Sequence, residues 1–272
     1  AREYAGECDY AVWLNAVDPG VGRTGVTHAG SVSGRMGRPG GPVANERIAL
    51  QTIFERVRVT GGRVHLRRLS SAAGIDLVRR AKQEGLRITA DVAVHHLHLI
   101  DIDIADFDPN FRVQPPFRSQ RDREAIRSGL ADGTIDVVCS DHAPIDDDAK
   151  QLPFGEAEPG VTALELLLPL SLKWARESGF TMAQAIQRLT SNPATVLGRD
   201  AGQLGIGAQA DICIFQPNRV WTVNAKNLFS QGCNTPYFGL DIEGQVSTVL
   251  VDGRCVFDRS KGGFAAGHKP RA

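Results

Sequence analysis

The stretch Ile135-Asp136-Val137-Val138-Cys139-Ser140-Asp141-His142-Ala143-Pro144 begins as an apolar run and ends abruptly in polar residues. Successive β-branched and apolar residues are typical of a strand buried on both faces, as in a parallel sheet covered by helices. In an α/β barrel, the functional site lies at the carboxyl ends of the strands. Asp141 and His142 are therefore candidate site residues. The alternative is that Asp141 caps the following turn.

Strand and helix patterns alternate on either side of this stretch. Predicted strands span 10–16, 63–69, 87–94 and 135–140, and predicted helices span 43–60, 72–84, 119–132, 161–177 and 181–190. Alternation at this spacing predicts right-handed βαβ units and a parallel sheet. Residues 1–9 are typical of the end of a helix. The glycine-rich segment 18–41 has no GxxxxGK[ST] motif and is typical of a mobile surface loop.

Four such strands make up about half of an eight-stranded barrel. Beyond residue 200 the pattern changes to short strands, predicted at 210–215, 220–223, 245–252 and 254–258. Short strands separated by turn residues are typical of an antiparallel sheet. We therefore predict an α/β fold. Residues 1–200 form part of a (β/α)8 TIM barrel, and residues 201–272 form a small antiparallel β appendage.

Composition excludes several classes of protein. The 31 basic and 31 acidic residues cancel, so no net field recruits nucleic acid or an anionic membrane. The longest apolar run, residues 163–172, contains Glu165 and is far shorter than the roughly 20 residues of a membrane span. Five scattered cysteines without a CxxC pair argue against a disulfide framework or a structural zinc site. A cytoplasmic location fits this cysteine usage best.

Candidate metal ligands follow two of the predicted strands. His95, His96 and His98 follow one strand, and Asp141 and His142 follow another. Imidazole and carboxylate side chains at neighbouring strand ends are the ligands of a catalytic zinc ion, which lowers the pKa of a bound water. The alternative is that these histidines are structural residues with satisfied hydrogen bonds.

The segment from Ser140 to Glu165 resembles the signature of the dihydroorotases, members of the amidohydrolase superfamily. The matching residues are Ser140-Asp141-His142-Ala143-Pro144, Lys150, Pro153-Phe154, Ala157, Pro159-Gly160 and Leu164-Glu165. Further matches to the same family occur in order along the chain, at Gln114-Pro115-Pro116-Phe117-Arg118-Ser119, Asp122-Arg123, Ser191-Asn192-Pro193-Ala194, Gly205 to Asp211, Asn234-Thr235-Pro236 and Val251-Asp252-Gly253. The resemblance covers nearly the whole chain.

This resemblance implies a zinc-dependent (β/α)8 barrel that interconverts N-carbamoyl-L-aspartate and dihydroorotate. It also implies that residues 201–272 contribute to a composite β-sandwich domain. His96 matches a histidine ligand of the family, and Asp141 matches the aspartate that both contacts the metal and acts as general base. The family's HxH pair, its adjacent arginine and the metal-bridging residue have no counterpart. The N-terminal part of the family fold is therefore expected to be missing.

Three positions depart from the family pattern in residues that matter for chemistry. Arg68 stands where the family has a histidine ligand, and a guanidinium has no lone pair to offer a metal. Gln114 replaces an asparagine that contacts substrate. Ile145 replaces a histidine that holds the substrate carboxylate, and its side chain forms no hydrogen bonds. The backbone of Gly160 matches a carboxylate-contacting glycine and is the remaining substrate-binding candidate besides Gln114.

These departures favour a degenerate, catalytically silent dihydroorotase-like protein, a structural partner of aspartate carbamoyltransferase in pyrimidine synthesis. In this interpretation zinc is absent or weakly bound, the chain is part of an oligomer, and Arg68 pairs with Asp141 in place of the metal. One alternative is an active zinc-dependent dihydroorotase whose missing ligands come from upstream residues or from another subunit. Another is a different cyclic-amide hydrolase, related to hydantoinase or allantoinase.

Overall fold

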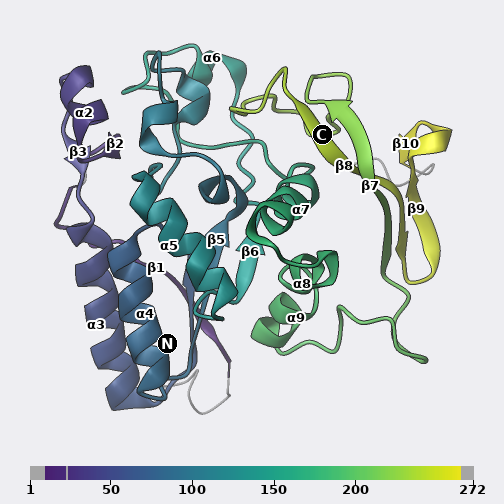
Figure 1. The fold of residues 1–272 in the computed structure, drawn as a ribbon, viewed down its shortest axis with the longest axis horizontal. Helices are drawn as coiled ribbons and strands as arrows, with labels where there is room; N and C mark the ends of the chain where they lie inside the picture. The colour runs from purple at the N-terminus through teal and green to yellow at the C-terminus, as the bar shows by residue number, and fades with distance from the viewer. Residues whose placement is uncertain (1–9, 23, 265–272) are drawn as a thin grey trace.

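A parallel four-stranded sheet forms the centre of the molecule (Figure 1). The computed structural model describes residues 10–22 and 24–264. The sheet has the order β1-β4-β5-β6, and every neighbouring pair is parallel. Its strands are β1 Val12–Asn15, β4 Val64–Arg67, β5 Ile88–Ala93 and β6 Val137–Cys139. The four predicted strands are thus confirmed with shorter bounds, and the barrel is partial. The helix expected at residues 1–9 lies outside the described residues.

Helices pack on one face of this sheet through a shared apolar core. They are α3 Ala44–Thr60, α4 Ala72–Gln83, α5 Gln120–Ala131, α7 Leu167–Ser178 and α8 Met182–Gln187, and α9 Ser191–Leu197 follows α8. Ser71 caps α4, because its side chain accepts a hydrogen bond from the Gly74 amide. Alternate strand residues such as Leu66 and Val92 point into the core under these helices and are fully buried.

The other face of the sheet is unusually polar. By the period of two, Trp13, His65, Asp91 and Cys139 point away from the helices. Contacts between them confirm this placement: the Trp13 and His65 rings lie 4.5 Å apart, and the Cys139 Sγ lies 3.5 Å from Asp91 Oδ1. The interior of a (β/α)8 barrel is normally filled by branched apolar side chains. Charged groups on this face therefore need partners, and those partners define the candidate site below.

The segment 18–41 is more ordered than the predicted mobile loop. It contains the helix α2 Ser31–Met36 and a parallel pairing between β2 Thr27–His28 and β3 Gly40–Gly41. Val32 is fully buried against a second apolar cluster that includes Phe117 and Phe154. The prediction of a mobile loop was therefore wrong for residues 31–36. Packing of the buried Val32 against residues distant in the sequence orders this helix.

One helix prediction is corrected by the structure, and two further helices were not predicted. The helix expected at 161–177 begins only at Leu167, because Val161 bridges to His142 and the Thr162 amide donates to the Asn234 carbonyl. The helices α9 and α6 Asp147–Lys150 were not predicted. Short 3₁₀ turns occupy the proline-marked segment 100–117, at Asp101–Asp103 and Pro109–Phe111, and a further one, Val94–Leu97, follows β5.

The C-terminal part is an antiparallel sheet, as predicted; it has four strands, of which β10 was not predicted (Figure 1). Its order is β10-β9-β8-β7, with β7 Ile212–Thr222, β8 Asp241–Val251, β9 Arg254–Asp258 and β10 Gly263–Phe264. The two predicted strands at 210–215 and 220–223 are one strand with irregular pairing between Gln216 and Val220. Pro217 lies in this irregular part, where no ladder hydrogen bond is required of it.

Hydrogen bonds join the C-terminal part to the barrel part. The Glu165 carboxylate accepts from the Phe229 amide at 2.8 Å and from the Ser230 amide at 2.7 Å. Asn234 bridges Ala143, Gly160 and Thr162. The division into residues 1–200 and 201–272 stays a prediction.

Two further expectations concern the described residues only. No helix in residues 10–22 and 24–264 has the length and apolar character needed to cross a bilayer. The four cysteines in these ranges are Cys139, Cys213, Cys233 and Cys255, and none forms a disulfide there.

A buried carboxylate fixes the start of α4 against α3. Glu46 is only 3% exposed and accepts four hydrogen bonds from Ser70 and Ser71. The two amides lie 2.9 and 3.1 Å from the carboxylate oxygens, and the two hydroxyls lie 2.7 and 2.6 Å from them. A Cβ at Gly74 would lie 1.9 Å from Glu46 Oε1, so this approach requires glycine.

We expect Glu46→Gln to lower the free energy of unfolding by about 2–4 kcal/mol, because an amide offers one acceptor oxygen where four donors need two. Urea denaturation of the chain measures this difference. The matched control is Glu55→Gln on the same helix, where the side chain is exposed. A loss equal to that of the control would contradict the structural role of Glu46.

Candidate functional site

Arg68 and Asp141 form an ion pair at the carboxyl end of the parallel sheet. Arg68 follows β4 and Asp141 follows β6, and Arg68 Nη1 lies 3.1 Å from Asp141 Oδ1. The pairing that the sequence predicts is therefore confirmed. Both residues have a left-handed backbone, with φ of 57° and 46°. That conformation is costly for residues other than glycine and is held in place by surrounding contacts.

The Asp91 carboxylate holds Arg68 in this conformation from below. Asp91 Oδ1 accepts the Arg68 amide hydrogen at 2.7 Å, and Asp91 Oδ2 lies 3.0 Å from His65 Nε2. The other ring nitrogen of His65 lies 2.8 Å from the Thr89 hydroxyl. The side chains of Asp91 and His65 therefore have hydrogen-bond partners at every polar atom. The Arg68 side chain is directed towards Asp141.

Burial and charge oppose each other at Asp141. Burial raises the pKa of the Asp141 carboxyl above its usual value, and the guanidinium of Arg68 offsets only part of this effect. Burial also raises the pKa of the Cys139 thiol, and the carboxylates of Asp91 and Asp141 add to this shift. Cys139 is therefore a neutral thiol at pH 7 and a poor nucleophile.

The five candidate ligands, four histidines and Asp141, do not come together in one site in the described part of the chain. His95 and His96 are buried beside Phe117. The ring nitrogens of His95 have no hydrogen-bond partner in the described part of the chain, whereas the backbone of Pro115 and Pro116 lies beside the His96 ring. Burial lowers the pKa of His96 to about 4. His98 Nε2 lies 2.9 Å from the Leu170 carbonyl oxygen, close to α7. His142 Nδ1 accepts hydrogen bonds from the Ala163 and Leu164 amides.

The residues present do not fit a zinc ion. Zinc sites in proteins use at least three protein ligands in one place. Among the described residues, no group of three or more histidine, cysteine, aspartate or glutamate side chains could hold a metal. The buried imidazoles of His95 and His96 are the residues most suited to a metal. Arg68, however, holds the Asp141 carboxylate and places a positive charge beside it.

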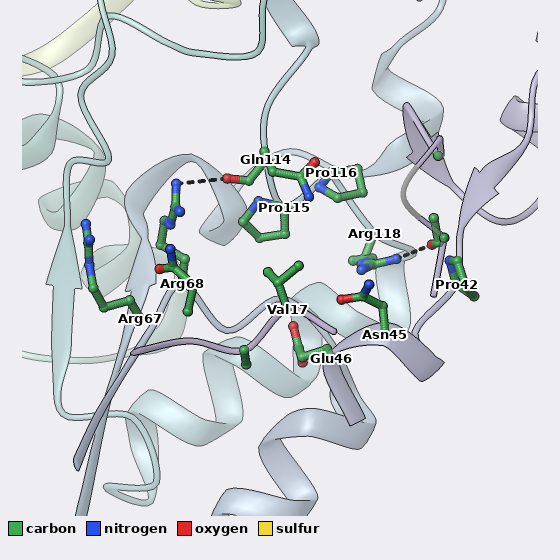
Figure 2. A pocket seen from close by; sticks show the side chains of 15 residues that line it. Val17, Pro42, Asn45, Glu46, Arg67, Arg68, Gln114, Pro115, Pro116 and Arg118 are labelled. Carbon is green, nitrogen blue, oxygen red and sulfur yellow. Dashed lines mark hydrogen bonds between the residues drawn. The ribbon is translucent and has the colours of Figure 1, made fainter. Parts of the chain in front are cut away.

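A small cavity of about 40 Å³ opens beside Arg68, between the carboxyl ends of β1 and β4 (Figure 2). Its lining residues come from the strand ends, the glycine-rich segment, the start of α3 and the proline segment: Asn15, Ala16, Val17, Gly22, Gly25, Gly41, Pro42, Asn45, Glu46, Arg67, Arg68, Gln114, Pro115, Pro116 and Arg118. Of the predicted site residues, Gln114 lines this cavity, and its backbone carbonyl accepts from Arg68 Nη1 at 3.0 Å (Figure 2).

Gly160 lies elsewhere and its backbone groups are engaged. Its amide donates to the Arg112 carbonyl at 2.9 Å, and its carbonyl accepts from Asn234 at 3.0 Å. A Cβ built at Gly160 would lie 3.0 Å from Ile145 Cγ1, so Ile145 fills the space beside the glycine. Apolar packing thus occupies the position that the family resemblance assigns to substrate binding.

Sequence reasoning missed Asp91 and Arg118. Arg118 is buried and donates to Ser70 Oγ and to the Gly41 carbonyl, at 3.2 and 2.6 Å. The signal for Asp91 was present, because an aspartate interrupts an otherwise apolar strand. Arg118 lies in the run that matches the family, but its role was not predicted, since its partners are 48 and 77 residues away in the sequence.

Comparisons with known proteins agree with this architecture. The amidohydrolase family model matches residues 64–256. A dihydroorotase of Syntrophus aciditrophicus is 35% identical over 257 residues, which are 94% of this chain and 60% of that protein. A dihydroorotase-like protein of Pseudomonas aeruginosa is 36% identical over 253 residues, 93% of this chain and 60% of that protein. The chain thus spans about 60% of the length of these relatives.

Solved structures show the same fold at lower identity. A dihydropyrimidinase from Brevibacillus agri superimposes with a TM-score of 0.85 at 20% identity, covering 98% of this chain and 61% of that structure. An L-hydantoinase from Arthrobacter aurescens superimposes with a TM-score of 0.83 at 21% identity, covering 93% and 58%. Since the family model covers most of the sequence and the strand topology agrees, the chain belongs to the amidohydrolase family.

Proposed function

We propose that the chain is part of a catalytically silent dihydroorotase-like protein of de novo pyrimidine synthesis, a structural partner of aspartate carbamoyltransferase. The observation that carries this proposal is the Arg68–Asp141 ion pair at the end of the sheet where the family binds metal. In this account the guanidinium stands in place of the metal, and Asp141 is a vestigial general base.

Electrostatics explains why this pair opposes hydrolysis. Hydrolysis in the family depends on a water made acidic by a bound metal. The Arg68 guanidinium stays protonated at all physiological pH values, so it repels a cation and gives no lone pair to it. The two oxygens of Asp141 lie 3.1 and 3.5 Å from Arg68 Nη1, so the carboxylate that would receive the proton is already paired.

Substrate binding is weakened in the same account. Ile145 packs against Gly160 where a hydrogen-bonding side chain would hold the substrate carboxylate. The Gly160 amide donates to Arg112 and is not free for an anion. The names of relatives support the same direction: curated proteins of Pseudomonas putida and Pseudomonas aeruginosa, both 36% identical to this chain, are called dihydroorotase-like proteins.

The partnership with aspartate carbamoyltransferase comes from the family resemblance, and the cytoplasmic location comes from the cysteine usage; both stay predictions. A scaffold role needs a rigid barrel face and does not require turnover. The buried network of Glu46, Arg118 and Ser70 supplies such rigidity next to the emptied site.

An active zinc-dependent dihydroorotase is the second candidate, and one observation favours it. The ring nitrogens of His95 are buried without a partner in the described ranges, as those of an unused ligand would be. Ligands from another part of the protein or another subunit would complete such a site. Those ligands would restore neither Arg68 nor Ile145 to a histidine. A hydantoinase-type activity is a weaker candidate, because structural likeness at 20–21% identity shows the fold alone.

Two assays test the proposed function. Dihydroorotate hydrolysis is followed with the chain in zinc-containing buffer, and association is followed by size-exclusion chromatography with the aspartate carbamoyltransferase of the same source. We expect no turnover above buffer, and co-elution of the two proteins. Turnover that a chelator abolishes would favour the second candidate, and separate elution would remove the scaffold role.

We expect Arg68 and Asp141 to be energetically coupled in the folded protein. Their side chains are 23% and 16% exposed, so the pair lies between the surface and buried limits. Removing the arginine leaves a carboxylate in a partly buried place, so Arg68→Ala should lower the free energy of unfolding by about 1–3 kcal/mol. The coupling free energy is obtained from urea denaturation of Arg68→Ala, of Asp141→Ala and of the variant that carries both substitutions. Additive effects would contradict a direct pair.

A further inference from the structure

Residues 25–41, here called the flap, form a compact unit beside the carboxyl end of the parallel sheet. Its strands β2 and β3 pair with each other, and the Ala29 amide donates to the Gly41 carbonyl at 3.3 Å. The Ser33 hydroxyl donates to the Gly30 carbonyl at 2.9 Å. These bonds lie inside the flap, so the flap can separate from the barrel part as a unit without breaking them.

A buried guanidinium of the barrel part bonds both strands of the flap. Arg118 is only 6% exposed, and its Nη1 donates to the Gly41 carbonyl of β3 at 2.6 Å (Figure 2). The same nitrogen lies 3.3 Å from Nδ1 of His28 in β2. Its Nε donates to the Ser70 hydroxyl at 3.2 Å, which anchors the guanidinium to the barrel part.

The other side-chain attachments of the flap are apolar or exposed. Val32 is fully buried in the apolar cluster that contains Phe117. Arg38 Nη2 lies 3.6 Å from Glu156 Oε1, but these side chains are 54% and 59% exposed, so the ion pair contributes little. The position of the flap therefore depends on the apolar contact and on the buried hydrogen bonds from Arg118.

The contact between Arg118 and His28 requires a neutral imidazole. A guanidinium stays protonated and offers donors only, so Nδ1 of His28 must accept the hydrogen bond and carry no proton. The proton of the neutral ring is then on Nε2. A second proton would turn Nδ1 into a donor. Two donors and two positive charges would then face each other at 3.3 Å, and the hydrogen bond would be lost.

The charges around His28 oppose its protonation overall. Burial lowers the pKa of His28, and the Arg118 guanidinium lowers it further. Two carboxylates, Asp122 of α5 and Asp101 of the 3₁₀ turn, raise this pKa, each less strongly than Arg118 lowers it. Glu46 of α3 acts on Arg118, whose pKa burial nevertheless lowers from its ordinary value. The attached flap thus favours the neutral form of His28.

We propose that His28 is a pH-sensitive latch, whose protonation breaks the hydrogen bond from Arg118 and releases the flap from the barrel part. Because Gly25 and Gly41 line the cavity beside Arg68, release of the flap opens this cavity to solvent. The latch goes beyond the proposed function and requires neither catalytic silence nor a protein partner.

The direction of the pH effect follows from linkage. Attachment of the flap lowers the pKa of His28 below its ordinary value of about 6.5. The stabilisation of the attached state is therefore fully present above about pH 6.5 and is lost as the pH falls through the lowered value. Each pKa unit of difference between the attached and released states corresponds to about a tenfold change in the equilibrium of release.

Hydrogen exchange of the full chain, measured by mass spectrometry at about pH 7.5 and about pH 5 and corrected for intrinsic exchange rates, tests the latch. We expect the protection of residues 25–41 to be severalfold lower at the acidic pH, and the protection of α4 to be unchanged. Equal protection of the flap at both pH values would overturn the latch. A loss of the same size in α4 would also overturn it, since it would show general acid unfolding.

His28→Gln identifies the group that titrates. Its amide oxygen can accept from Arg118 but takes up no proton in this range, so flap protection should be the same at both pH values. The matched control is His142→Gln. His142 is also half-buried, but its Nδ1 accepts from the Ala163 and Leu164 amides, so this variant should keep the pH dependence. A pH dependence that persists in His28→Gln would contradict the latch.

A measurement on the wild type covers the case in which His28→Gln does not fold. The imidazole resonances of His28 are titrated by NMR, and their midpoint is compared with the midpoint of flap release from hydrogen exchange. The two midpoints should coincide below about pH 6.5. A His28 midpoint at or above this value, or two separate midpoints, would overturn the proposal. Neither measurement involves zinc, substrate or a partner, so a failure leaves the proposed function untouched.

Discussion

The Asp91 carboxylate is the constraint on which the sheet end depends. It lies in the middle of the sheet face that a barrel normally fills with apolar side chains, and it accepts the Arg68 amide and contacts His65. These contacts hold Arg68 in a left-handed conformation, with φ of 57°, and turn its side chain towards Asp141. A buried charge without such partners would be strongly destabilising. The polar interior and the strand-end ion pair are therefore one connected arrangement.

This arrangement also determines how the ion pair contributes to stability. Arg68 partly offsets the cost of burying Asp141, yet the pKa of Asp141 remains raised. Because the folded-state pKa of this carboxyl is raised, its contribution to stability is greatest below its unfolded-state pKa and falls as the pH rises through the folded-state value. The ion pair is thus not a source of large stability at neutral pH. In the proposed function, its role is to occupy the carboxylate and exclude a cation.

Much of the fold was predictable from the sequence, because it depends on local periodicity. Apolar alternation located the four parallel strands, and Ser71 and Ser119 mark the starts of α4 and α5. Long-range contacts decided what the sequence did not predict. Val32 orders α2 through its packing on residues such as Phe117. The helix α7 begins later than predicted because the Thr162 amide donates a hydrogen bond to the Asn234 carbonyl. The contact between Arg68 and Asp141 was predictable from the family resemblance, whereas Asp91, Arg118 and the cavity emerged only from the assembled sheet.

Zinc per chain, measured by elemental analysis on protein grown with zinc and purified without chelator, tests the central claim most directly. If the Arg68–Asp141 pair takes the place of the metal, the chain contains less than about a tenth of an equivalent, because two imidazoles and a paired carboxylate hold zinc poorly. Arg68→His, prepared in the same way, serves as the comparison and should gain zinc. About one equivalent or more in the wild type would contradict the account, since it would mean that a metal site survives around His96 and Asp141.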